Sequence, residues 1–496
     1  KLKMNIIVVI NLNVSIFAYV HMYANFFIGQ CGNQIGSAFW PLALHEYGIQ
    51  FKNGLTDFLK IQRDHIKNID ALWDGFSSFF HIPGNTDNLC FKTIAELNVA
   101  KVKARAILID MEDSVVARFR HGPLRGLFDA TCTVTNYPGS ANNWATGYYT
   151  HGNQYHDQIE EVIRQTVELC DNLNGFLLLH SVGGGTGSGL GTATLKMLHD
   201  NYPRVDRLVS SIYPAGMEDV ITGPYNMLLA TRELIDHATC VFPVENKALL
   251  EICETQIKNR DNMDQANFNT LCLPFQDMNS IIVNMLLHLT SGSRFPGNLN
   301  VDMSDLATNL VPYQKMHYIY SSVSPAALTA PKLLITNSSK LQDMLFTNAW
   351  SRSNQLIKIH PLQPGSVVLS AAHIGRGKYS ITGMKRNIER FQTKAKFTSW
   401  SKDSMKIGLC SIPPPGHATS LLCLLNTSAI SLMFKNLIEQ FTKLYCRKAH
   451  VHHYSQVSGF DETQFLDSKE AISNLYQHYM ELQNQKQRHI SRLQIL

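Results

Sequence analysis

Hydrophobic residues along the chain gather into short runs, and these runs are separated by stretches with helical spacing. Residues 176–182 (Phe-Leu-Leu-Leu-His-Ser-Val) form an apolar run that is typical of a buried strand, and residues 106–110 and 240–244 repeat the pattern. Between such runs, residues 154–173 place apolar side chains three and four positions apart, as on one face of a helix. Strands that alternate with helices predict an α/β fold, with a parallel sheet covered by helices on both faces.

The same pattern divides the chain into parts. We expect an N-terminal extension (1–27), a first α/β domain (28–274) with a polar, asparagine-rich insertion (255–272), a joining helix (275–293), a mixed α/β domain (294–425) and a C-terminal helical region (426–496). The extension resembles a signal peptide, because a basic start precedes an apolar stretch. Three asparagines interrupt that stretch and no small-x-small cleavage site follows it. We therefore favour an extension or a gene-model artefact over secretion.

Composition narrows the functional classes. A chain of 496 residues with 45% hydrophobic and 17% charged residues is globular, with sizeable cores. The net charge of +5 is too small for this length to indicate nucleic-acid binding, and we expect neither a nucleic-acid nor a membrane partner. The ten cysteines contain no C-x-x-C pair, which suits reduced thiols in the cytosol better than a disulfide framework.

A glycine-rich stretch follows the apolar run at 176–182. It reads Gly183, Gly184, Gly185, Thr186, Gly187, Ser188, Gly189 and precedes a predicted helix at 190–202. A strand, a glycine loop and a helix together present backbone N–H groups and a helix N-terminus to phosphate. Glycine suits such a loop because some positions need positive φ and because a Cβ would hold the backbone away from the anion.

Other interpretations of this loop are weaker. It lacks the lysine of the common P-loop. No strand ending in an acid follows about 20 residues later, as the dinucleotide-binding fingerprint requires. A flexible linker is disfavoured because the loop lies between a strand and a helix. Phosphate binding is the better interpretation.

The ends of two further predicted strands place candidate ligand-binding residues at the same edge of the sheet. Residues 29–34 (Gly-Gln-Cys-Gly-Asn-Gln) form a second glycine loop between an apolar run and a predicted helix. Asp110 ends the strand at 106–110, and Glu112 follows two residues later. These carboxylates are placed to hold Mg²⁺ through water; the alternative is an acid that caps the helix at 114–120.

Three other clusters carry weaker signals. Cys446, His450, His452 and His453 are metal-ligand types, but no second ligand pair has zinc spacing. Residues 375–378 (Gly-Arg-Gly-Lys) are predicted to be a loop more readily than an anion site. The basic set Lys385, Arg386 and Arg390 is predicted to be a solvated helix face. No catalytic triad stands out.

Four motifs together resemble the tubulin family. They are the glycine stretch at 183–189, Gly-Gln-Cys-Gly-Asn-Gln at 29–34, Asn-Asn-Trp at 142–144 and Gly-Asn-Leu-Asn-Val-Asp at 297–302. All four occur in the family's order, and the resemblance covers roughly residues 28 to 465. Within the family, the stretches at 103–112, 211–214, 386–390 and 448–454 resemble the epsilon branch.

This resemblance implies a Rossmann-like GTPase domain that binds GTP or GDP with Mg²⁺, followed by an intermediate domain and C-terminal helices. It places Gln30 and Cys31 by the phosphates and base, Asn143 and residues 183–189 at the phosphates, Asp110 and Glu112 near Mg²⁺, Asp219 at the ribose, Asn246 and Asn279 at guanine, and Phe275 stacked on guanine. An asparagine amide offers that base both a donor and an acceptor. Gly223 departs from the family, which has a ribose-binding glutamate there.

The resemblance also implies how the protein works. The loop at 297–302 and the helix after it would meet the nucleotide of the next subunit in a filament, and Asp305 stands where alpha-tubulin has a catalytic glutamate. We expect slow GTP hydrolysis that Asp305 completes in trans, unless Asp305 is only a first-turn acid favoured by the helix dipole. The expected partners are other tubulins and centriolar proteins.

The expected location is the cytoskeleton, at centrosomes, centrioles and basal bodies with compound (triplet) microtubules. The C-terminal segment is weakly basic, unlike the acidic tail of lattice tubulins. A bulk cytoplasmic microtubule subunit, a structural GTP-binding scaffold without turnover and a nicotinamide-dependent oxidoreductase are the alternatives.

Overall fold

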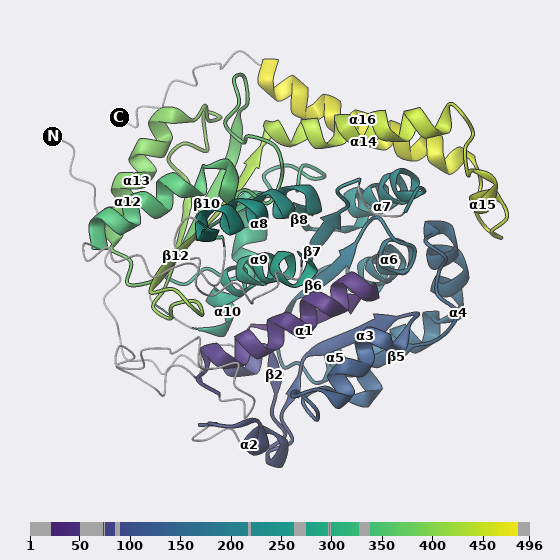
Figure 1. Cartoon of the computed structure of the whole chain (residues 1–496), viewed down its shortest axis with the longest axis horizontal. Coiled ribbons are helices and arrows are strands. Elements are labelled where there is room, and N and C mark those ends of the chain that lie inside the picture. Colours follow the sequence, from purple (N-terminus) through teal and green to yellow (C-terminus); the bar gives the residue numbers. More distant parts are fainter. Residues whose placement is uncertain are drawn as a thin grey trace, which may run out of the picture.

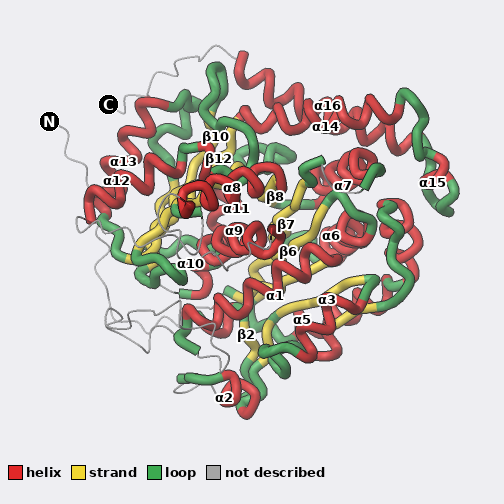
Figure 2. The backbone as a smooth tube through the Cα atoms, viewed as in Figure 1, coloured by secondary structure: helices red, strands yellow, loops and turns green. Residues whose placement is uncertain are grey.

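The computed structural model describes residues 21–49, 73, 75–84, 90–216, 220–261, 274–295, 297, 299–326 and 338–484. A six-stranded, fully parallel sheet forms the centre of the first domain (Figures 1 and 2). Its order is β5 (Thr133–Thr135), β4 (Ala106–Asp110), β1 (Met22–Ile28), β6 (Leu173–Ser181), β7 (Asp206–Tyr213) and β8 (Cys240–Glu245). The predicted parallel sheet is thus confirmed.

Helices cover both faces of this sheet because its strands are apolar on both sides. In β1, Phe26 packs into one hydrophobic core and its neighbour Phe27 into the other, as the two-residue repeat of a strand requires. The first core receives α5 (His156–Glu168), α6 (Gly191–Asn201) and α7 (Gly223–His237). The second receives α1 (Gly29–Glu46), α3 (Asp113–His121), α8 (Asn246–Asp261) and α9 (Pro274–Leu289).

A second sheet forms the mixed α/β part of the chain. Its order is β11 (Lys406–Cys410), β10 (Val368–Gly377), β12 (Thr419–Thr427) and β9 (Tyr320–Ser324), with β10 parallel to β11 and antiparallel to β12. Around it lie α10 (Ser291–Arg294), α11 (Met303–Leu310), α12 (Ser338–Ala349) and α13 (Ile381–Lys394). Helix α9 contacts α1 as well as β9, β10 and β12 of the second sheet.

The C-terminal helices pack across the first domain. Helices α14 (Ser431–Tyr445) and α16 (Thr463–Asn484) lie side by side and contact α7, and the short α15 (His452–Ser455) connects them (Figure 1). Smaller elements complete the described chain: β2 (Phe80–His81), α2 (Ile94–Val99), β3 (Lys103–Ala104), α4 (Gly152–Gln154) and short helical turns at 76–78, 130–132, 146–151, 186–190, 352–354 and 428–430. None of the described helices is both long and apolar enough to cross a bilayer.

Three sequence-based boundaries are corrected. Strand β1 begins at Met22, so residues 22–27 belong to the sheet, while residues 1–20 lie outside the described chain. Asn25 lies inside this strand, where its buried Nδ2 donates to Arg105 O (2.9 Å). Residues 29–34 are not a loop, since α1 begins at Gly29. Part of the predicted insertion (255–261) continues α8, and residues 262–272 lie outside the described chain.

The stretch at 375–378 is also not the loop that we predicted. Gly375 to Gly377 end β10, and Arg376 is fully buried. Its Nη1 lies 2.7 Å from Glu46 Oε1, and Arg294 Nη1 binds the other carboxylate oxygen of Glu46. The ring of Phe295 lies against both guanidinium groups, at 4.9 and 5.9 Å. This buried ionic triad (Glu46, Arg294, Arg376) joins the end of α1 to α10 and to the second sheet.

Candidate functional site: a cavity at the carboxyl edge of the parallel sheet

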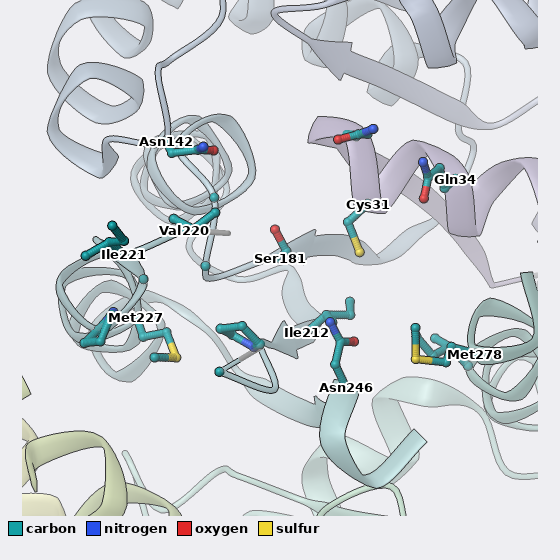
Figure 3. A pocket seen from close by; sticks show the side chains of 18 of the residues that line it. Cys31, Gln34, Asn142, Ser181, Ile212, Val220, Ile221, Met227, Asn246 and Met278 are labelled. Carbon is teal, nitrogen blue, oxygen red and sulfur yellow. The ribbon is translucent and has the colours of Figure 1, made fainter. Parts of the chain in front are cut away.

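A cavity of about 780 Å³ opens where the parallel strands of the first sheet end. Ser181 ends β6, Asn246 follows β8, and Gln30 follows β1, so three strand ends supply its wall. This is the position at which open α/β sheets bind ligands. In Figure 3, Cys31 and Gln34 come from α1, Ser181 from β6, Asn246 from α8 and Met278 from α9, around one space.

The glycine-rich stretch shapes one wall of this cavity. The chain bends at 182–185 and then forms a helical turn at Thr186–Leu190 that leads into α6. None of its five glycines has the positive φ that we expected. A Cβ on Gly185 would lie 2.8 Å from Asn143 N, and one on Gly189 would lie 2.3 Å from Trp144 O. Glycine is therefore required here by the close approach of a neighbouring backbone segment.

That neighbouring segment is strained. Ala141 and Asn142 both have left-handed φ, 47° and 53°, which side-chain-bearing residues adopt rarely. Such strain persists only where surrounding contacts impose it, and it concentrates at functional sites. Here Asn142 O accepts hydrogen bonds from Thr222 Oγ1 (3.0 Å) and Asn226 Nδ2 (2.8 Å).

Asn226 connects the loops around the cavity, and the sequence analysis missed it. It is fully buried at the start of α7. Its Nδ2 also donates to Gly183 O (2.8 Å), while its Oδ1 accepts from Trp144 N (2.9 Å) and Tyr454 Oη (2.6 Å). One amide thus fixes the glycine stretch, the strained segment and α15 together. The signal was a polar residue directly before the apolar run Met227-Leu228-Leu229.

The cavity brings together six of the predicted nucleotide-binding residues. They are Gln30, Cys31, Gly183, Gly184, Asn246 and Asn279. Asn143 is not among the lining residues, because its Nδ2 donates to His453 O (2.9 Å) and its Oδ1 accepts from Ala145 N (2.9 Å). The adjacent Asn142 lines the cavity instead.

The second half of the glycine stretch lies behind the lining. Ser188 Oγ donates to Gly184 O and, at 3.3 Å, to Gly185 O, so its hydroxyl is used within the turn. Thr186 Oγ1 shares a hydrogen bond with Ser140 Oγ (3.0 Å). Gly187 packs against Gly29, where a Cβ would lie 3.0 Å from Gly187 N. Asp219 and the side chain of Phe275 lie outside the described residues.

One end of the cavity has the chemistry of a base-binding site. Asn246 and Asn279 come from different helices, and Ile212, Met278 and Ile282 lie around them. Apolar walls with two amides fit a flat heterocycle that carries both donors and acceptors. Burial raises the pKa of the Cys31 thiol to about 12, so this wall stays uncharged at neutral pH.

The two candidate Mg²⁺ ligands, Asp110 and Glu112, do not line the cavity. Asp110 is buried at the end of β4, and its Oδ2 has no hydrogen-bond partner among the described residues. Burial and then the nearby Glu112 raise the pKa of Asp110 to about 7. Glu112 is exposed at the N-cap of α3, and its side chain makes no capping hydrogen bond. An unpartnered buried oxygen and an exposed carboxylate fit a hard cation, although Asp110 must first lose its proton.

The histidine-rich segment does not form the metal cluster that its composition allowed. Among the described residues, the ligand atoms close enough to share an ion belong to His156, Asp157 and Glu160, all exposed on α5. The rings of His452 and His453 lie 4.0 Å apart in a surface segment, and His453 contributes its backbone carbonyl to Asn143. The set Lys385, Arg386 and Arg390 is exposed on α13, as predicted.

Asp305 lies on α11 and does not line this chain's own cavity. Its backbone N–H donates to Asp302 Oδ1 (2.7 Å), which caps the helix. Its side chain is 47% exposed and pairs with Lys406, whose Nζ lies 3.4 Å from Asp305 Oδ1. A role in this chain's own cavity is therefore excluded by position, and a role toward a neighbouring molecule is sterically open.

Comparison with known proteins places this architecture in a family. Residues 24–254 match the GTPase domain of the Tubulin/FtsZ family, and residues 314–439 match the tubulin C-terminal domain. The tubulin epsilon chains of Mus musculus and Homo sapiens are each 40% identical over 473 residues, covering 92% of this chain and 94% of theirs. The tubulin alpha-3 chain of Saccharomyces cerevisiae is 32% identical over 92% of this chain and 96% of its own.

Each of the two domain matches corresponds to one of the two sheets. The sequence identity to the epsilon chains (40%) is higher than the identity to the alpha-3 chain (32%). The glycine stretch, most of the residues that line the cavity and all of the first sheet except Met22 and Tyr23 fall within the GTPase-domain match. The chain therefore belongs to the tubulin family, the GTP-binding subunits of microtubules.

Proposed function

We propose that the cavity binds GTP or GDP, with Mg²⁺ held beside the phosphates by Asp110 and Glu112. The convergence of Gln30, Gly183, Gly184, Asn246 and Asn279 on one cavity carries this proposal. Backbone N–H groups at the start of α1 and in the glycine stretch would bind phosphate, and the two asparagine amides would bind guanine. Mg²⁺ would supply charge neutralisation for the phosphates.

We propose further that GTP is hydrolysed slowly, in trans, between longitudinal neighbours. Asp305 is half exposed on a surface away from its own cavity, so it can reach the nucleotide of another subunit. A carboxylate there would orient the attacking water and accept its proton.

Replacing Asp305 with Ala should lower GTP turnover in a longitudinal assembly by about a hundredfold or more, the range of a general base. Assembly itself should be retained, since the side chain is half exposed. Turnover is measured at matched amounts of assembled protein. The exposed Asp403 serves as the control, and Asp403→Ala should behave as wild type. Unchanged turnover in Asp305→Ala would leave Asp305 as a first-turn acid that only favours the helix dipole.

The cellular role that we propose is in centrioles and basal bodies, where this tubulin would form or stabilise triplet microtubules with other tubulins and centriolar proteins. The higher identity to the epsilon chains supports this branch of the family. A structural scaffold that binds GTP without turnover is the second candidate, favoured by the position of Asp305, which does not line this chain's own cavity.

A tagged copy at native expression should localise to centrosomal foci, and depletion should remove the triplet organisation of centrioles. Fluorescence microscopy and electron microscopy of centriole cross-sections give the two measurements. Label along the whole cytoplasmic microtubule array would identify a bulk subunit and refute the centriolar role.

A further inference from the structure

Lys406 lies beside Asp305, and neither residue lines the cavity. It opens β11, the edge strand of the second sheet, and pairs with Ala372 of β10. Its Nζ lies 3.4 Å from Asp305 Oδ1, and its side chain is 31% exposed. The ammonium group therefore has access to both solvent and the carboxylate.

The backbone holds this lysine in register with Asp305. Leu409 N donates to Leu299 O (2.9 Å), which ties β11 to the loop that leads into α11. A Cβ on Gly408 would lie 3.2 Å from the side chain of Val301, so the strand and the loop are in close contact. Asp302 then caps α11 through Asp305 N. The two side chains thus project from one packed unit, and their proximity is built into the fold.

An ion pair between two partly exposed side chains stabilises a protein very little. A lysine that occupies Oδ1 also competes with the water whose proton that oxygen is to accept. The ion pair is therefore suited to a subunit without a docked neighbour, in which neither side chain takes part in hydrolysis. A triphosphate brought against this surface carries more charge than Asp305 and would attract the ammonium group away from it.

From this geometry we infer that Lys406 is a second catalytic residue for GTP hydrolysis in trans, whose ammonium group moves from Asp305 to the γ-phosphate of the neighbouring subunit. The inference rests on the proposed function of Asp305. An isolated subunit would be slow because Asp305 and Lys406 do not line its own cavity, and the two side chains remain paired until a neighbour docks.

The step balances with the groups named. The water oxygen forms a bond to the γ-phosphorus, and the bond from phosphorus to the β–γ bridging oxygen breaks. That oxygen keeps the electron pair and leaves with GDP. The proton of the water passes to the freed Asp305 carboxylate and from there to inorganic phosphate. Lys406 keeps its proton and stabilises the charge on the transferred phosphoryl group, as cationic side chains supplied in trans do in other phosphoryl transfers.

The test compares Lys406→Met and Lys406→Arg with Lys402→Met, a control at an exposed lysine in the preceding segment. GTP turnover is measured over a range of protein concentrations, and assembled protein is determined by sedimentation. Lys406→Met should lower turnover per assembled subunit by about a hundredfold, while Lys406→Arg stays within about threefold of wild type. Lys402→Met should match wild type. Circular dichroism verifies folding, and Lys406→Gln replaces Lys406→Met should the latter not fold.

A transition-state analogue separates catalysis from structure. Assembly with GDP and aluminium fluoride should weaken by about tenfold or more in Lys406→Met, while assembly with a non-hydrolysable GTP analogue should be unchanged. If Lys406→Met keeps wild-type turnover while Asp305→Asn is impaired, the catalytic role of Lys406 is wrong and hydrolysis in trans by Asp305 still holds. Wild-type turnover in Asp305→Asn, or turnover per subunit that does not rise with concentration, would overturn hydrolysis in trans and Lys406 with it.

Discussion

Replacing Glu46 with Gln should lower the free energy of unfolding by about 3–5 kcal/mol, the usual effect of removing one partner from a buried ion pair. Glu46 is the only acidic member of the buried ionic triad, and all three side chains are fully buried. Glutamine keeps the shape of the side chain but leaves Arg294 and Arg376 as two like charges without a counter-ion. Although burial opposes it, the Glu46 carboxylate holds the pKa of Arg376 above its ordinary value, so this guanidinium stays charged.

The triad also predicts that removing one arginine destabilises the protein less than removing the charge of Glu46. Arg376→Met should cost within about 2 kcal/mol, because it leaves a neutral Glu46–Arg294 pair. Leu287 O, which accepts from Arg376 Nη1 (3.1 Å), would still accept from Arg294 Nη2 (2.9 Å). Denaturant unfolding of both variants, with Arg390→Met as an exposed control, gives the comparison. A larger loss in Arg376→Met than in Glu46→Gln would contradict this account of the charges.

Replacing Asn226 with Leu should destabilise the protein by about 3–5 kcal/mol and weaken GTP binding at least tenfold. The substitution preserves the branching of the side chain but leaves Gly183 O and Trp144 N buried without their partner, at about 1–3 kcal/mol each. It also removes the bond that holds Asn142 in its strained conformation against the cavity. Misplaced phosphate-binding groups lower affinity steeply, because binding depends on a preformed site.

Nucleotide titration and denaturant unfolding on the same samples check both effects. Asn201→Leu is the matched control, since Asn201 is exposed on α6, where its Nδ2 donates to Glu160 Oε1 (2.9 Å). Wild-type affinity in Asn226→Leu would show that the bonding of Asn226 does not position the phosphate-binding loops.

The fold was largely predictable because its signal is local. The apolar runs at 106–110, 176–182 and 240–244 lie in β4, β6 and β8, apart from Val182 just past the end of β6. The helix expected after the loop at 297–302 is α11. The sequence-based predictions were wrong where a buried polar residue bonds a partner that is distant in sequence. Asn25 bonds Arg105 across 80 residues, and Arg376 pairs with Glu46 across 330. A single sequence cannot reveal such pairings, so residues 22–27 were assigned to an extension and residues 375–378 to a loop.

The sequence predicted several residues that line the cavity, but it did not predict which neighbouring side chain faces it. Two neighbouring asparagines, Asn142 and Asn143, offer the same chemistry, and only backbone conformation decides which one faces the cavity. The glycines of 183–189 pointed to a close approach, yet part of that approach is to the protein's own backbone. Asn226 was overlooked because its role lies in joining three segments that are distant in sequence.

The identity of the nucleotide that purified protein carries tests the central claim most directly. Protein is isolated without added nucleotide and denatured, and the released compound is identified by chromatography. A competition between GTP and ATP on the emptied protein follows. The account predicts GTP or GDP in amounts comparable to the protein, with GTP displacing ATP. Release of NAD or NADP, or ATP displacing GTP, would contradict it.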